Sequence, residues 1–246
     1  MASKPPPLRI DGIGKSYNAL PAVHSVSLTV GFDEILGIVG ADSSGKSTLS
    51  RIICGLETAD EGDVFVNGRW MSPGSPDAAR RLGVELVDGA ESLSLNLDVA
   101  HNIFLGRYPL KFGMFIDKTQ MYRKTRALLD GSGLADISGT QKLGELSGGM
   151  RQIIAIIRAI SFDPKVLILD EPTRNLSQNV VSRFDRLLLH MKNRHVAQIF
   201  TTRRPAEAIA LCDRIIVMRH GRIVREGPAR VFKAGELATM MMSDDE

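Results

Sequence analysis

The stretch Gly40-Ala41-Asp42-Ser43-Ser44-Gly45-Lys46-Ser47 decides the fold class of this protein. It fits the pattern Gly-x-x-x-x-Gly-Lys-Ser/Thr. The mostly apolar segment 34–39 before it predicts a buried strand, and the apolar spacing within residues 46–56 predicts a helix after it. Glycines let the backbone wrap closely around a phosphate, and the N–H groups that open the helix point at the anion. We therefore predict a phosphate-binding loop between a strand and a helix of an α/β fold.

Two side chains of this loop have specific expected roles. Lys46 supplies a positive charge for the β- and γ-phosphates of a nucleotide, and the Ser47 hydroxyl is an expected ligand of Mg²⁺. A Gly/Ser loop that matches by accident is the alternative, and the flanking strand and helix count against it. We therefore predict that the chain binds ATP with Mg²⁺. The residues predicted to bind ATP in this loop are Gly40, Ala41, Asp42, Ser43, Ser44, Gly45, Lys46, Ser47 and Thr48.

A second motif, Asp170-Glu171, ends an apolar segment at residues 166–169 that predicts a buried strand. Ligands of parallel sheets gather at the carboxyl ends of the strands. Asp170 is therefore the expected second ligand of Mg²⁺, and Glu171 is the expected catalytic base for an attacking water. A surface turn before Pro172 is the alternative interpretation, and the phosphate loop upstream disfavours it.

Composition excludes several classes of protein. The chain has 246 residues, of which 43% are hydrophobic and 24% charged, so it can bury a substantial core. A net charge of +3 is too small to indicate a nucleic-acid-binding surface. Two cysteines, Cys54 and Cys212, cannot make a disulfide framework, which favours a reducing compartment. The longest apolar stretches fall far short of the roughly 20 residues that span a bilayer, and the first residues contain no apolar signal core.

The order of predicted elements indicates one α/β domain over residues 1–246 with a mainly parallel sheet, an N-terminal antiparallel part and an inserted helical subdomain. The core is predicted at residues 8–87 and 160–232, the helical subdomain at 88–159, and a C-terminal tail at 233–246. An Asn67-Gly68 turn predicts a hairpin. The other predicted strands are at residues 26–30, 165–169, 196–201 and 214–218. Within residues 88–143 only helices, such as 121–129, and loops are predicted.

A third motif, Leu146-Ser147-Gly148-Gly149-Met150, precedes a strongly patterned helix and follows the phosphate loop in the chain. With these three motifs in this order, residues 8–232 resemble the ATP-binding subunits of ABC transporters. The motifs correspond to that family's Walker A loop, its signature, and its Walker B strand. Residues 75–83 and 102–107 are most similar to the importers of monosaccharides such as ribose, xylose or fructose.

The resemblance implies a mechanism and partners. Two ATP-binding domains would dimerise head to tail, so that the signature of one chain, from Leu146 to Met150, covers the ATP of the other. The chain would lie at the cytoplasmic face of the membrane, where closure of the dimer would drive transmembrane permease subunits, and a solute-binding protein would be an indirect partner. The resemblance also implies that adenine stacks on Tyr17, for which an ordinary strand-edge tyrosine is the alternative.

Two positions depart from the family pattern. Gly89 occupies the position of a glutamine that contacts Mg²⁺ or the attacking water, and Asp88 or Glu91 could substitute as oxygen ligands. Arg203 occupies the position of the switch histidine near the γ-phosphate. Arginine donates hydrogen bonds but cannot accept one, so it can hold the γ-phosphate without replacing every role of imidazole. The segment 175–177 also lacks the aspartate often found after Walker B.

Three functions remain open from the sequence. The leading prediction is an ATPase that couples ATP binding and hydrolysis to import, most simply of a sugar, with weak or partner-dependent turnover. The second is a regulatory or structural subunit that binds ATP with little or no hydrolysis. The third, a soluble ABC ATPase acting on nucleic acid or ribosomes, is disfavoured by the small net charge and by the single cassette. The sequence does not decide between a homodimer and a heterodimer.

Overall fold

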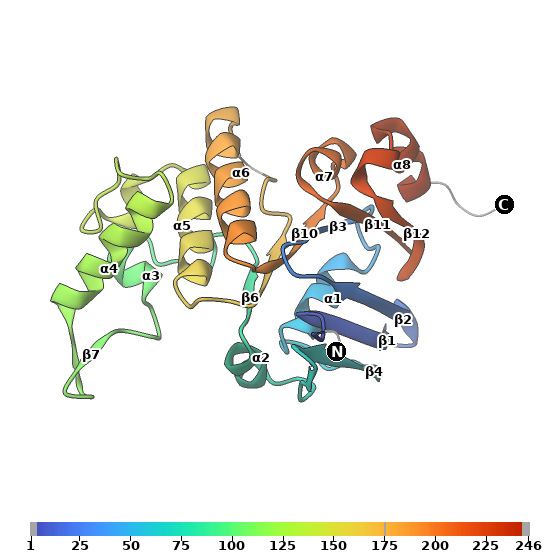
Figure 1. The fold of residues 1–246 in the computed structure, drawn as a ribbon, viewed down its shortest axis with the longest axis horizontal. Coiled ribbons are helices and arrows are strands. Elements are labelled where there is room, and N and C mark those ends of the chain that lie inside the picture. The colour runs from blue at the N-terminus through green and yellow to red at the C-terminus, as the bar shows by residue number, and fades with distance from the viewer. Residues whose placement is uncertain (1–3, 175, 243–246) are drawn as a thin grey trace. The chain divides into compact units, whose positions relative to one another are not determined.

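A computed structural model describes residues 4–174 and 176–242, so Asn175 of the segment noted above lies outside the described residues. The chain divides into two compact units (Figure 1). The first contains the described residues up to Leu86, the segment Pro164–Pro172, and the residues from Lys192 onward. The second contains Val87–Asp163 and Thr173–Met191.

A six-stranded sheet in the order β12-β11-β3-β10-β9-β6 forms the frame of the first unit. β10 pairs in parallel with both β3 and β9, and β11 pairs in parallel with β3, while β12 runs antiparallel to β11. The sheet is therefore mainly parallel, as the sequence predicted. Its strands are β3 (Ile35–Val39), β6 (Val84–Val87), β9 (Val166–Asp170), β10 (Ala197–Thr202), β11 (Arg214–Arg219) and β12 (Arg222–Pro228).

A four-stranded antiparallel sheet in the order β2-β1-β4-β5 is the second layer of this unit. Its β4–β5 hairpin turns at Asn67 and Gly68, whose φ angles of 49° and 76° are those that an Asn-Gly turn requires. The predicted hairpin and antiparallel part are therefore confirmed. The strands are β1 (Leu8–Tyr17), β2 (Leu20–Val30), β4 (Glu61–Val66) and β5 (Arg69–Trp70).

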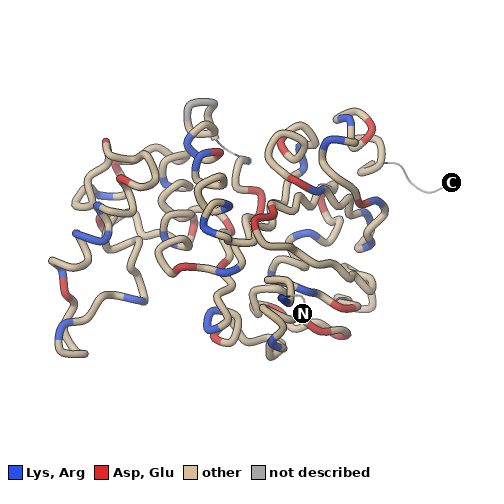
Figure 2. The backbone as a smooth tube through the Cα atoms, viewed as in Figure 1, with Lys and Arg blue, Asp and Glu red and all other residues tan. Residues whose placement is uncertain are grey.

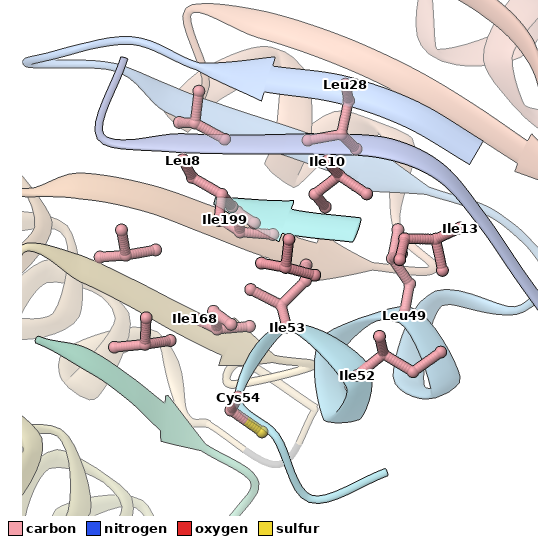
Figure 3. Packing of buried hydrophobic residues seen from close by; sticks show 14 of the residues in the cluster. Leu8, Ile10, Ile13, Leu28, Leu49, Ile52, Ile53, Cys54, Ile168 and Ile199 are labelled. Atoms are coloured by element: carbon pink, nitrogen blue, oxygen red, sulfur yellow. The ribbon is translucent and has the colours of Figure 1, made fainter. Parts of the chain in front are cut away.

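Helix α1 (Lys46–Ile53) contributes to a buried apolar cluster that also contains side chains from both sheets (Figure 3). Leu49 and Ile53 are fully buried there, together with Ile10 of β1 and Ile168 of β9. Burying each such side chain stabilises the fold by about 1.5–3 kcal/mol. Because the phosphate loop leads directly into α1, this cluster fixes the position of the loop. The helix ends at Ile53, three residues earlier than position 56, where the sequence placed its end.

The second unit is mainly helical. Its elements are α3 (Val99–Ile103), β7 (Leu110–Lys111), β8 (Phe115–Ile116), α4 (Lys118–Gly131), α5 (Gly148–Ile160) and most of α6 (Gln178–Asn193). The β7–β8 hairpin corrects the sequence prediction, which placed only helices and loops within residues 88–143. Its segment is too short, and its turn residue Phe112 too untypical, to give a strand and turn signal.

The remaining helices are α2 (Pro76–Leu82), α7 (Pro205–Leu211) and α8 (Ala234–Met242), which lies within the segment predicted as a tail. Two 3₁₀ turns occur at Leu143–Glu145 and Ala229–Val231. Among the described residues, no helix is both long enough and apolar enough to cross a bilayer. Basic and acidic residues are interspersed along both units (Figure 2).

Candidate nucleotide-binding site

The phosphate loop needs glycine at two positions for steric reasons. A Cβ on Gly40 would lie 2.4 Å from the carbonyl oxygen of Met218 and 2.4 Å from Ser44 Oγ. Gly45 has a φ of 99°, and a Cβ there would lie 2.4 Å from the carbonyl oxygen of Ala22. All three distances are far below van der Waals contact, so the loop can adopt this compact path only with glycine at positions 40 and 45.

The side chain of Lys46 lies within the phosphate loop, as the sequence predicted. Its Nζ donates hydrogen bonds to the carbonyl oxygens of Gly40 and Ala41, both at 2.8 Å, and lies 3.1 Å from Ser44 Oγ. Burial lowers the pKa of Lys46, and the nearby charge of Arg203 lowers it further, whereas three carboxylates oppose this shift. Those carboxylates belong to Glu171, Asp170 and Asp42. A buried ammonium with three donors and two backbone carbonyl partners is available for exchange onto phosphate oxygens.

The acidic pair lies at the carboxyl end of β9, beside β10. Thr201 pairs with Asp170 in the parallel register, and its Oγ1 donates to Asp170 Oδ1 at 2.5 Å. The same Oγ1 accepts the backbone N–H of Glu171 at 3.0 Å. Glu171 has a φ of 45°, an uncommon value for a residue with a side chain. Thr201 therefore holds both acidic residues, and the sequence analysis did not single it out.

Arg203 follows β10 directly and contacts the phosphate loop on one side and the segment after β9 on the other. Its Nη1 lies 3.0 and 2.8 Å from the two carboxylate oxygens of Asp42, and its Nε lies 3.1 Å from Glu171 Oε1. Arg203 and Glu171 are partly buried, whereas Asp42 is 76% exposed. The sequence predicted a position near the γ-phosphate for Arg203, but it did not predict that Asp42 and Glu171 would be its partners.

Tyr17 ends β1, and its side chain is 44% exposed. Its hydroxyl donates to Glu57, and Lys15 Nζ lies 5.7 Å from the centre of its ring. Burial of the hydroxyl, followed by the hydrogen bond to Glu57, raises the pKa of Tyr17. The hydroxyl is also close enough to Thr48 of α1 for a hydrogen bond that opposes this shift. The ring thus lies at the helix that follows the phosphate loop, with part of its surface open to stacking.

The predicted signature residues lie in the second unit, at the start of α5. Ser147 is the N-cap of the helix, and its Oγ accepts the N–H of Met150 at 3.3 Å. Leu146 is buried, whereas Ser147 and Gly148 are exposed. A Cβ on Gly148 would meet nothing within 4 Å, but one on Gly149 would meet Val180 at 3.2 Å. The N-terminus of α5 is therefore exposed and accessible to a second molecule.

Gly89 comes two residues after the end of β6. Its φ is 74°, a value that a residue with a side chain rarely adopts, although the space around a Cβ there is open apart from Glu91. A glutamine at position 89 would therefore be strained by its backbone rather than by its neighbours. Backbone conformation explains why glycine is suited to this position, whatever its function.

The fold and this site define an ATP-binding cassette. The sequence matches the ABC transporter family over residues 23–174, so the chain belongs to that family. It is 33% identical over 231 residues to the ribose import ATP-binding protein RbsA of Chromobacterium violaceum. It is 32% identical over 235 residues to the galactose/methyl galactoside import ATP-binding protein MglA of Escherichia coli K12. These matches cover 94% and 96% of this chain but 46% of each relative, so the chain spans about half the length of the curated relatives it matches.

Solved structures agree with this assignment. A nucleotide-free ATP-binding cassette from an ABC transporter superposes with a TM-score of 0.81 at 26% identity, covering 90% of both chains. A dimeric cassette in a post-hydrolysis state with ADP and Pi superposes with a TM-score of 0.78, covering 92% of this chain and all of the other. The identity of the second pair is 22%, so it shows the shared fold alone.

Proposed function

We propose that this chain binds and hydrolyses ATP to drive the import of a sugar through partner membrane subunits. The observation that carries the proposal is that the carboxylates of Asp170 and Glu171 lie close enough to Lys46 to influence its charge. Lys46 belongs to a phosphate loop whose backbone path requires glycine at positions 40 and 45. The similarity to ATP-binding proteins of ribose and galactose import supports sugar as the substrate class. The chain would bind a transmembrane permease at the cytoplasmic face of the membrane, and its other partner would be a second cassette.

The residues of the loop suit ATP with Mg²⁺. Ser47 is exposed at the start of α1, and Asp170 keeps one oxygen beyond its bond to Thr201, so these two would hold the cation. A hydroxyl and a carboxylate are oxygen ligands that suit Mg²⁺, whose remaining ligands would be phosphate oxygens and waters. When bound, the ion supplies positive charge at the phosphates. Glu171 would accept the proton of the attacking water, and Lys46 would hold the β- and γ-phosphates.

ATP binding with little hydrolysis is the second candidate function. Two observations favour it specifically. Arg203 Nε lies 3.1 Å from Glu171 Oε1, so a guanidinium contact already occupies the oxygen that would accept the proton of water. Gly89 has no side chain to orient water or metal. Under this alternative, the chain would act through ATP-dependent closure, and a partner cassette with complete catalytic residues would perform turnover.

A binding experiment separates these functions from no nucleotide role at all. Titration of the purified chain with a fluorescent ATP analogue and Mg²⁺ should give saturable binding, and Lys46→Ala should weaken it at least tenfold, because the phosphates lose their buried cation. Arg204→Gln is the matched control, since Arg204 is the next residue in the chain and pairs with Glu207. Equal affinity in the wild type and Lys46→Ala would reject the proposed site. Phosphate release by the wild type then decides between hydrolysis and binding alone.

The transport step needs a cellular test. A deletion strain of the source organism should lose uptake of one labelled sugar among ribose, galactose, xylose and fructose while amino-acid uptake is retained. The wild-type gene and Arg204→Gln should restore uptake, and Lys46→Ala should not. Normal uptake of every sugar in the deletion strain would reject sugar import as the function while leaving ATP binding in place.

A further inference from the structure

The β7–β8 hairpin protrudes from the helices of the second unit and exposes a dense group of apolar side chains (Figure 1). Five of the 15 large hydrophobic side chains that the described residues expose lie within this one short segment. They are Leu110, Phe112, Met114, Phe115 and Ile116. Single exposed apolar residues are normal, but a contiguous group of them marks an interaction surface. The hairpin is therefore a candidate docking element.

The apolar side chains lie on both faces of the hairpin. Leu110 pairs with Ile116 in the antiparallel register, and opposed residues point to the same face. Phe115 pairs with Lys111, and this next pair points to the other face, because successive side chains alternate. Phe112 lies at the turn between the strands. A groove on a partner protein would cover one face of such a ribbon, whereas a lipid interface surrounds the whole tip.

The hairpin belongs to a strongly basic segment. Residues 107–131, which reach to the end of α4, contain six of the 31 Lys and Arg residues of the chain but two of its 28 acidic residues. The segment therefore has a net charge of +4, whereas the rest of the chain has −1. One of the acidic residues, Asp117, caps α4 by accepting the N–H of Gln120 at 2.8 Å. Exposed basic residues beside apolar ones complement the anionic headgroups of a lipid leaflet.

Phe112 occupies the turn against its backbone preference. Its φ is positive, which is strained for an aromatic residue, and its ring is exposed, so burial within the protein does not compensate the strain. Lys111 Nζ lies 5.4 Å from the centre of the ring, which places a cation beside the aromatic tip. Insertion of the ring into a lipid interface would compensate the strain outside the protein.

We propose that the β7–β8 hairpin docks on an anionic lipid surface. Phe112, Met114 and Phe115 enter the boundary between headgroups and acyl chains, while Lys111 and Lys118 contact the headgroups. The insertion is confined to the interface, because each strand has only two residues and cannot cross the hydrocarbon core. This contact adds to the proposed attachment through a permease and requires neither the permease nor ATP.

Vesicle binding by the purified chain tests the proposal. Vesicles of phosphatidylcholine with about one third phosphatidylglycerol supply the anionic surface, and pure phosphatidylcholine is the uncharged reference. The wild type should bind the anionic vesicles at least tenfold more tightly, and high salt should remove this preference. Phe112→Asn with Met114→Asn should weaken binding at least tenfold. Lys111→Gln with Lys118→Gln should do the same, since each basic residue near such a surface contributes roughly fivefold.

Matched controls change the same chemistry elsewhere. Leu189→Asn replaces an exposed apolar residue of α6 in the same unit. Arg230→Gln with Lys233→Gln removes two exposed positive charges from the first unit. Both variants should bind the vesicles within about twofold of the wild type. Lys46→Ala should also bind them normally, so a failure of the proposed ATP binding would leave the vesicle result unchanged.

A tryptophan probe locates the contact. Trp70 is the only tryptophan of the chain, so Phe112→Trp in a Trp70→Phe background places a single fluorophore at the turn. Its emission should shift to shorter wavelength on anionic vesicles and be quenched by lipids brominated on the acyl chains near the headgroup. Unchanged emission on bound vesicles, or hairpin variants that bind as tightly as the wild type, would reject insertion. Wild-type binding to native membranes but not to protein-free vesicles would make the occupant a membrane protein and overturn the lipid proposal.

Discussion

At the scale of single residues, Thr201 links the side chain of Asp170 to the backbone of Glu171. Its hydroxyl donates to Asp170 and accepts the N–H of Glu171, whose φ is positive. A residue held in a sparsely populated backbone conformation needs such support, because the conformation costs on the order of 1–3 kcal/mol. Thr201 therefore fixes the position of Glu171.

Thr201→Val should lower turnover more than nucleotide affinity. Valine keeps the shape but removes the hydroxyl, so Asp170 and the N–H of Glu171 lose a partner, at a cost of about 1–3 kcal/mol in unfolding free energy. The proposed catalytic rate constant should fall about tenfold or more, with ATP affinity changed less than about threefold, because the phosphate loop does not contain Thr201. Phosphate release, calorimetry and urea unfolding measure the three quantities.

Thr201→Ser is the control, since it retains Oγ and should keep most of the activity. A Thr201→Val variant with full turnover would show that the hydroxyl is dispensable for positioning Glu171. Equal losses of affinity and turnover in both variants would instead point to a general packing role for this buried residue.

How much of the site could be predicted depends on how local each feature is. The phosphate loop is a continuous segment whose glycines, lysine and serine have fixed roles, so its residues were predictable from the sequence alone. The contact between Arg203 and Asp42 joins residues 161 positions apart. It exists because β10 lies beside β3 in the sheet, so the ends of both strands share one edge. The sequence predicted the strands but not their order, and the pair could not be foreseen.

At the scale of elements, the β7–β8 hairpin carries an unusual turn. Phe112 and Gly113 both have positive φ, 55° and 72°, and the N–H of Met114 bonds to the carbonyl oxygen of Lys111 at 3.4 Å. Turns of this kind favour Asn and Gly, whereas an aromatic residue with positive φ is strained. Phe112 is also 84% exposed, so its ring gains little from burial. Fold stability does not account for phenylalanine at this position.

Phe112→Asn should leave the protein as stable as the wild type or raise its unfolding free energy by up to about 1 kcal/mol. Asparagine adopts positive φ more readily, and few contacts of the exposed ring are lost. Chemical denaturation with circular dichroism is the measurement. Leu129→Ala on α4 of the same unit is the control, because Leu129 is fully buried and its truncation should cost about 2–5 kcal/mol.

A loss of more than 1 kcal/mol in Phe112→Asn would contradict this account and show that the ring packs against the protein.

The β7–β8 hairpin also shows why some elements were easier to predict from the sequence than others. The β4–β5 hairpin has an apolar run at residues 64–66 followed by an Asn-Gly turn, so the sequence indicated both a strand and its turn. In β7–β8 each strand is two residues long, and phenylalanine gives no turn signal, so the pattern indicated only a loop.

At the scale of the whole molecule, the two compact units carry different parts of the proposed ATP machinery. The phosphate loop and the acidic pair belong to the first unit, and the signature belongs to the second. The exposed N-terminus of α5 presents Ser147 and Gly148 outward, where they are accessible to a second copy of the chain or to a related cassette. The proposed head-to-tail dimer uses both units of each molecule.

Glu171→Gln should accumulate as an ATP-bound dimer, because the proposed base is lost while the phosphate loop remains. Glutamine also lacks the charge that holds Arg203 Nε, so the guanidinium is freer to contact the γ-phosphate. Light scattering coupled to size exclusion, with and without Mg-ATP, should show a doubling of mass only with ATP. Adding Lys46→Ala to the same variant should abolish the dimer, since that chain cannot retain the nucleotide.

Gly148→Asp provides the matched test of the signature surface. An added Cβ at Gly148 meets nothing within 4 Å, so the substitution should leave the monomer folded and its own ATP affinity within about twofold of the parent. A carboxylate at the start of α5 would, however, oppose the phosphates of the nucleotide held by the other chain. In the Glu171→Gln background, Gly148→Asp should therefore keep the chain monomeric at saturating Mg-ATP.

A Glu171→Gln variant that binds ATP yet stays monomeric would argue against pairing of two identical copies and for a second, different cassette as the partner. Dimerisation that Gly148→Asp leaves intact would place the interface elsewhere on the molecule.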